Sequence, residues 1–88
     1  MNSFLLTITT PGGEVFSGDV YMLSLRGAEG DLAILPGHIP FVTTVKAGEI
    51  TIEKPDGEEI KAAAGDGLLT VAPDKATLLL CSYTSADN

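Results

Sequence analysis

The sequence is poor in the residue types that most chemical sites require. Its 88 residues include one cysteine, one histidine and no tryptophan, with five Lys and Arg residues against twelve Asp and Glu residues. So few basic residues are poorly suited to neutralising nucleic-acid phosphates or to adhering to an anionic lipid surface. A single cysteine cannot form an internal disulfide, which fits a reducing compartment. Because basic residues are so few, we expect no nucleic-acid partner.

Targeting and membrane-spanning signals are also missing. Residues 1–6 lack the positive charge that begins a signal peptide. No apolar run approaches the roughly 20 residues that span a bilayer. Hydrophobic residues nevertheless make up 44% of the chain, and its mean hydropathy is +0.27, which indicates a folded core and not a disordered chain. We expect one small, acidic, soluble domain that faces the cytoplasm.

Glycine and proline placement predicts the fold class. Ten glycines and five prolines divide the chain into short runs that favour β-strands, and this leaves no room for a long helix. Strands average about 5–6 residues, so about ten fill this length. We predict an all-β fold, a flattened β-sandwich or barrel of about ten short strands in two sheets without substantial helix. The domain is expected over residues 3–84, with a polar tail over 85–88.

One hairpin can be placed in register from its apolar alternation. Setting Ile52 opposite Ile60 leaves residues 55–57 as a three-residue loop, whose glycine falls where such loops need a left-handed residue. The same register pairs Lys54 with Glu58, which is favourable. A slip by one residue would turn the isoleucines to solvent, so the apolar face fixes the register.

The last two predicted strands are apolar on both faces. Strands of this kind are usually covered on both sides. One side would be the core, and the other would need a further layer or a partner. The alternative is that Leu79 and Cys81 lie at a crowded edge of the sandwich, since lone exposed apolar residues are common. The candidate partner-covered residues are Leu78, Leu79, Leu80 and Cys81.

Catalysis is hard to build from this inventory. His38 lies between two prolines with no nucleophile close to it in the sequence, so a structural or interface role is favoured over general-base catalysis. One histidine and one cysteine cannot complete a zinc shell. Residues 65–67 lack the third glycine of a dinucleotide-binding loop, and their glycines are interpreted as turn residues with positive φ. We expect no catalytic residue, no cofactor and no metal.

Three motifs in a fixed order carry a family resemblance. The sequence contains Phe-Ser-Gly at 16–18, Gly-Ala-Glu-Gly-Asp-Leu at 27–32 and Leu-Pro-Gly-His-Ile-Pro at 35–40. Their order and spacing resemble the N-terminal β-sandwich domain of the epsilon subunit of F-type ATP synthases, which is called delta in mitochondria. The resemblance covers essentially residues 4–82, with supporting matches at 8–13, 46–48 and 65–71.

The resemblance implies a non-catalytic rotor subunit of the central stalk, which links the gamma subunit to the c-ring and couples ion translocation to ATP synthesis. Membrane association would then occur only through the complex, at the cytoplasmic face of the bacterial inner membrane or on the stromal side of a thylakoid. The implied c-ring contacts are Glu29, Gly30 and Asp31. The implied gamma-subunit contacts are His38, Ile39, Pro40 and Thr43.

The contact motifs also have a physical interpretation. Pro36 and Gly37 suit the central positions of a type II turn, and Pro40 restrains the residue before it to an extended conformation. A stiff, exposed segment loses little entropy on binding and is therefore a good docking surface. The acids Glu29 and Asp31 have no cation close to them in the sequence, so they form either a solvated turn or a contact with the polar loops of a partner.

The sequence departs from the family at its C-terminal end. Family members usually continue into a two-helix hairpin that can inhibit ATP hydrolysis, and some members bind ATP there. Neither property is carried over, and we expect a naturally short subunit in preference to a truncated one. Two other hypotheses stay open. One is a free-standing β-sandwich module that binds a ligand, and the other is a minimal hydrolase that uses His38 and an acid.

Overall fold

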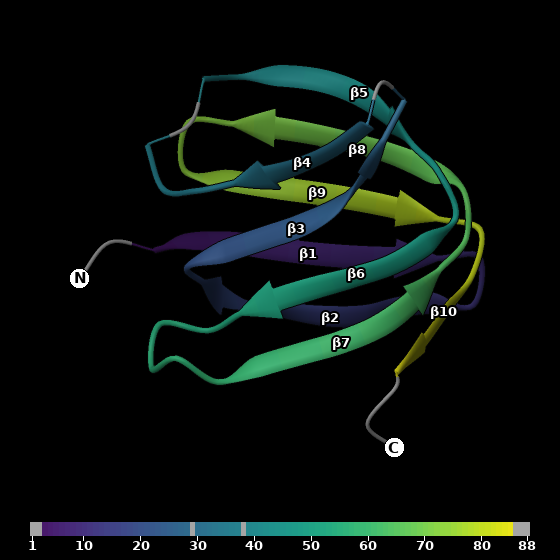
Figure 1. Cartoon of the computed structure of the whole chain (residues 1–88), viewed down its shortest axis with the longest axis horizontal. Coiled ribbons are helices and arrows are strands. Elements are labelled where there is room, and N and C mark those ends of the chain that lie inside the picture. Colours follow the sequence, from purple (N-terminus) through teal and green to yellow (C-terminus); the bar gives the residue numbers. More distant parts are fainter. Residues whose placement is uncertain (1–2, 29, 38, 86–88) are drawn as a thin grey trace.

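The computed structural model describes residues 3–28, 30–37 and 39–85, and these residues form strands joined by turns. None of the described residues is helical, so the predicted all-β class is confirmed. The ten strands, shown in Figure 1, are β1 (Phe4–Thr10), β2 (Gly13–Val20), β3 (Met22–Gly27), β4 (Gly30–Ile34), β5 (Phe41–Val45), β6 (Gly48–Glu53), β7 (Glu59–Ala64), β8 (Gly67–Ala72), β9 (Lys75–Leu80) and β10 (Tyr83–Ser85).

The strands form two layers around a common interior, which confirms the predicted flattened sandwich or barrel of about ten short strands (Figure 1). One layer has the order β4-β3-β6-β7-β10, and the other has the order β5-β8-β9-β1-β2. Neighbouring strands are antiparallel, apart from the parallel pair of β1 and β9. The two layers join where β3 meets β5 at the single pair Gly27–Val45, so the strands make one nearly closed, barrel-like sheet.

Three of the bends that carry the chain from one layer to the other lie between β5 and β6, between β7 and β8, and between β9 and β10 (Figure 1). Asp66, in the middle bend, contacts both neighbouring bends. Its carboxylate Oδ1 accepts a hydrogen bond from the Ala47 N–H at 2.8 Å, and its backbone oxygen accepts one from the Cys81 N–H at 2.9 Å. The three bends are therefore fixed to one another by one residue.

The glycines of the middle bend are required by close packing. Positive φ values occur at Gly13, Gly30, Gly37, Gly48 and Gly57, but not at Gly65 or Gly67. The expectation of positive φ at these two positions is therefore wrong. A Cβ atom at Gly67 would overlap the backbone oxygen of Leu79, and one at Gly65 would overlap the side chain of Cys81. At Gly67 glycine is needed because the backbone of the paired strand β9 lies too close for a side chain.

The hairpin of β6 and β7 has the predicted register, with Ile52 opposite Ile60. Gly57 has a φ of +93°, as the predicted loop requires. The Lys54 N–H donates to the backbone oxygen of Glu58 at 2.8 Å, and the Lys54 Nζ lies 3.9 Å from the Glu58 carboxylate. This hairpin was predictable because its register depends only on residues inside it.

The core lies between the layers and is made of alternating side chains from both. Every fully buried side chain in the described part of the chain is apolar. The largest fully buried side chains are Leu6, Ile8, Val20, Leu23, Ile50, Ile52, Leu69 and Leu78. A core without buried charge or unpaired polar groups avoids the desolvation cost of such groups.

Strand β10 was not predicted, and it extends across the predicted boundary between the domain and the polar tail. It pairs with the end of β7, Tyr83 opposite Ala64 and Ser85 opposite Ala62. The ring of Tyr83 packs against the core, and burial raises the pKa of its phenol above the ordinary value. The segment is ordered by pairing with a strand distant in the sequence, and its three residues are too few to indicate a strand by themselves.

Candidate functional site

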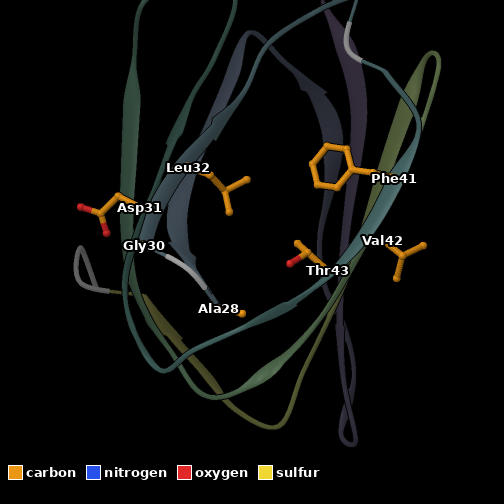
Figure 2. Close-up of a pocket in the computed structure, with 7 residues that line it drawn as sticks. All are labelled: Ala28, Gly30, Asp31, Leu32, Phe41, Val42 and Thr43. Atoms are coloured by element: carbon orange, nitrogen blue, oxygen red, sulfur yellow. The ribbon is translucent and has the colours of Figure 1, made fainter.

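Three of the predicted contact residues, Gly30, Asp31 and Thr43, line a shallow cleft between the facing edges of β4 and β5. The lining residues are Ala28, Gly30, Asp31, Leu32, Phe41, Val42 and Thr43. Figure 2 shows Leu32, Phe41 and Thr43 directed into the space between the two strands, whereas Val42 is directed away from it. We call this feature the β4–β5 cleft. It contains residues from both predicted contact sets.

The residues predicted to contact the c-ring form one wall of the β4–β5 cleft. Gly30 has a φ of +127°, which suits the tight connection of β3 to β4, and Asp31 is exposed. The Asp31 carboxylate lies 3.6 Å from the Arg26 Nε across this hairpin, so the acid does have a cation beside it. Both side chains are largely exposed, and exposed ion pairs contribute little to stability. The predicted contact at Glu29 lies outside the described residues.

The residues predicted to contact gamma lie on the opposite wall and just before it. Thr43 is half-buried in β5, and the side chain of Ile39 is 80% exposed. Pro40 is also exposed. The preceding turn has the predicted geometry, since Gly37 has a φ of +83°. His38 lies outside the described residues, so its predicted contact stays a prediction.

The outer surface of the β5-β8-β9-β1 layer is free of charge over two rows of side chains. We call these rows the uncharged face. Strand pairing aligns Thr44, Leu68, Leu79 and Thr9 in one row, and Val42, Thr70, Thr77 and Thr7 in the next. Val42 is 62% exposed and Leu79 is 47% exposed, although the chain carries a net charge of −7. Apolar side chains left in solvent on a flat, uncharged sheet are typical of a docking surface.

The other layer presents a different outer surface. Its outward positions include charged residues on four strands: Arg26 on β3, Asp31 on β4, Glu49 and Glu53 on β6, and Glu59 and Lys61 on β7. The Lys61 Nζ lies 3.8 Å from the Glu59 carboxylate. This surface is well suited to contact with water. The contrast makes the uncharged face the better candidate for burial by a partner.

The structure divides the residues predicted to form a partner-covered face. Leu78 and Leu80 are buried in the core of the chain itself, whereas Leu79 and Cys81 are exposed. The two late strands therefore alternate in the usual way, and only Leu79 and Cys81 are available to a partner. Sequence reasoning did not connect them with Val42 and Leu68. These residues join Leu79 on one surface only through pairing of strands that are distant in the sequence.

Residue clusters suited to other chemistry do not occur in the part of the chain that the structure describes. There, no three His, Cys, Asp or Glu side chains lie close enough together to hold a metal ion. Over the same residues, no helix has the length and apolarity needed to cross a membrane. The candidate sites are the β4–β5 cleft and the uncharged face.

Two solved structures share this fold. A chain in the structure of the Euglena gracilis mitochondrial ATP synthase, which comprises OSCP, F1 and c-ring, superposes with a TM-score of 0.92 at 18% identity, over 100% of this chain and 56% of that chain. A chain in the central stalk/c-ring structure of the Tetrahymena thermophila mitochondrial ATP synthase gives a TM-score of 0.75 at 15% identity, over 91% of this chain and 64% of that chain. At these identities the likeness defines the class of fold.

Sequence comparison then defines the family. Residues 3–86 match the family model described as the ATP synthase delta/epsilon chain, beta-sandwich domain. The chain is 41% identical to the ATP synthase epsilon chain of Bacillus velezensis over 88 residues, and 42% identical to that of Campylobacter hominis over 80 residues. It therefore belongs to the ATP synthase delta/epsilon chain family, which confirms the resemblance seen in the motifs.

The match does not extend over the whole length of these relatives. The alignment covers 100% of this chain but 66% of the Bacillus velezensis protein, and 90% of this chain but 62% of the Campylobacter hominis protein. The chain thus spans just under two thirds of the curated relatives that it matches. The shared part is the β-sandwich domain.

Proposed function

We propose that this chain is a non-catalytic central-stalk subunit of an ATP synthase, which joins the gamma subunit to the c-ring and helps couple ion translocation to ATP synthesis. It acts at the cytoplasmic face of a bacterial membrane and reaches that membrane only through the complex. The observation that carries the proposal is the adjacency of the two predicted contact sets, since Asp31 and Thr43 line the same cleft.

The surface chemistry supports this assignment. A rotor joint transmits torque through wide, specific interfaces and does not need an enclosed pocket. The uncharged face offers a flat apolar and threonine-rich surface next to β5, and exposed Ile39 lies just before that strand. The Asp31 carboxylate is exposed and directed away from the cleft (Figure 2), which suits contact with polar loops of a ring. The chain thus offers two chemically different surfaces to two partners.

Calorimetric titration with purified gamma subunit of the same organism tests the gamma contact. We expect micromolar or tighter binding, and an Ile39→Asp substitution should weaken it at least about tenfold because it places a charge in an apolar contact. Val15→Asp is the matched control. Val15 is 41% exposed on β2, at the far end of the layer from β5, so its substitution should change the affinity less than about threefold.

The outcomes separate the proposal from its alternatives. Failure of the unmodified chain to bind gamma at micromolar concentration would remove the main support for a stalk role and favour a free-standing ligand-binding module. Equal weakening by the Ile39 and Val15 variants would show that the contact does not involve the segment before β5.

A further inference from the structure

The two layers end in four edge strands, and one of them lacks the usual protection. Edge strands normally avoid pairing with other chains through charge, a bulge or short length. Strand β2 has Glu14 and Asp19 and a shift in register beside Ile8. Strand β10 has only three residues, and β4 includes Asp31. Strand β5 has the sequence Phe-Val-Thr-Thr-Val, with no charge, proline or register shift.

The open edge of β5 faces the β4–β5 cleft. Beyond its pairing with β8, the only residue of β5 that pairs with another described strand is Val45, which lies opposite Gly27. The Lys46 N–H, directly after the strand, donates to the Arg26 oxygen across this same edge at 2.9 Å. Backbone groups of a strand alternate between its two edges. The N–H and C=O groups of Val42 and the N–H group of Thr44 are therefore directed to the open edge. The Thr44 oxygen, on the same edge, already accepts a hydrogen bond from the Thr43 hydroxyl at 3.3 Å.

We propose that the open edge of β5 binds an extended segment of a partner polypeptide, which adds a strand to the sheet through the N–H and C=O groups of Val42 and the N–H group of Thr44. An added strand would form hydrogen bonds with these backbone donors and acceptors. A contact through side chains alone would leave them hydrogen-bonded to water. This inference rests on the proposed function in one respect, that the partner is the gamma subunit. Thr43 lies in β5 and Ile39 lies just before it, so the open edge of β5 is next to residues of the predicted gamma contact.

The side chains around the edge fit an added strand. Phe41, which is 37% exposed, and Leu32 point into the cleft, where inward side chains of the added strand would cover them (Figure 2). Val42 points to the other surface, where it is 62% exposed and would meet outward side chains of the same strand. Alternate pockets on both sides of a free edge are what strand addition uses for specificity.

A substitution that removes one N–H tests the backbone contact. Val42→Pro deletes the donor at the open edge and leaves the bonds to β8 in place, and proline is tolerated on an edge strand in this position. Val42→Thr is the matched control, because it keeps the N–H and a β-branched side chain. With purified gamma subunit we expect Val42→Pro to raise the Kd at least about tenfold and Val42→Thr to raise it less than about threefold.

Amide hydrogen exchange, followed by NMR, gives a second measurement of the backbone contact. It uses the unmodified chain and so does not require any variant to fold. In the free chain the Val42 and Thr44 amides should exchange rapidly, and saturating gamma should slow both at least about a hundredfold while the Asp19 amide of β2 changes little. An amide-to-ester replacement at Val42, made by chemical ligation, repeats the donor deletion without proline if Val42→Pro does not fold.

The outcomes distinguish this inference from the proposed function. If gamma binds the unmodified chain but binds the proline or ester variant equally well, with exchange at Val42 and Thr44 unchanged, strand addition is wrong and the stalk role stands. If gamma does not bind at all, the stalk role itself fails. If the free chain is a dimer that Val42→Pro dissociates, the edge belongs to a second copy and the proposal is overturned.

Discussion

Gly67 shows what a single residue contributes to this fold. It pairs with Val45 on one side and Leu80 on the other, and the backbone of β9 passes so close that a Cβ atom would overlap the Leu79 oxygen. The glycine is visible in the sequence, but the reason for it is not. The atom that excludes a side chain belongs to a residue that comes close only after the strands have paired.

We predict that Gly67→Ala destabilises the domain by about 1–3 kcal/mol, the usual range for overpacking. Gly12→Ala is the control, because the nearest atom to its added Cβ would be the Thr10 hydroxyl at 3.8 Å. The control should lie within about 0.5 kcal/mol of the unmodified chain. Urea unfolding followed by circular dichroism measures both. Equal stability of the two variants would show that β9 can move away from β8.

The ion pair of Asp31 is a second feature that the sequence alone does not show, here at a predicted contact residue. The sequence shows an acid with no adjacent cation, whereas the hairpin of β3 and β4 places Arg26 opposite it. Gly37 is the contrary case. Its positive φ was predictable, since a Pro-Gly pair defines its turn without help from the rest of the chain.

At the scale of the element, predictability follows the distance in sequence over which a strand is ordered. The hairpin of β6 and β7 is local, and its register was predicted residue by residue. Strand β10 depends on β7 and was missed. The apolar stretch of β9 was recognised, but its two sides could be told apart only once the layer had formed, with Leu78 inside and Leu79 outside.

Because Leu79 faces outward and Leu78 faces the core, substitutions at the two positions should affect gamma binding and stability separately. Leu79→Lys should lower the affinity for gamma about tenfold and leave the free energy of unfolding within about 0.5 kcal/mol, because its side chain is 47% exposed in the free chain. Leu78→Ala should lower the free energy of unfolding by about 2–5 kcal/mol, because its side chain is fully buried.

Chemical unfolding and titration with gamma, applied to the same preparations, measure the two effects. Collapse of the isolated fold in the Leu79→Lys variant would place Leu79 in the core and contradict the uncharged face. Unchanged affinity with unchanged stability would show that gamma binds elsewhere.

At the scale of the whole molecule, the fold and the family were predictable because the motifs and the turn residues both lie in continuous segments. The surface that we propose for gamma was predicted only in part, at Ile39, Pro40, Thr43 and Leu79. Its other members come from β1, β5 and β8, which become neighbours only through sheet pairing. Composition could not show that charge is absent from the two outer rows of the uncharged face, since it records only the total.

The central claim is that this one domain holds two partners at once. The direct test is retention of purified gamma subunit by c-rings reconstituted in liposomes, with and without the chain, after sedimentation. We predict that gamma sediments with the c-rings only when the chain is present. Asp31→Lys should abolish this retention while the binary affinity for gamma stays within about threefold, because the substitution reverses the charge on the c-ring wall alone. Equal retention of gamma with and without the chain, or none in either case, would contradict the account.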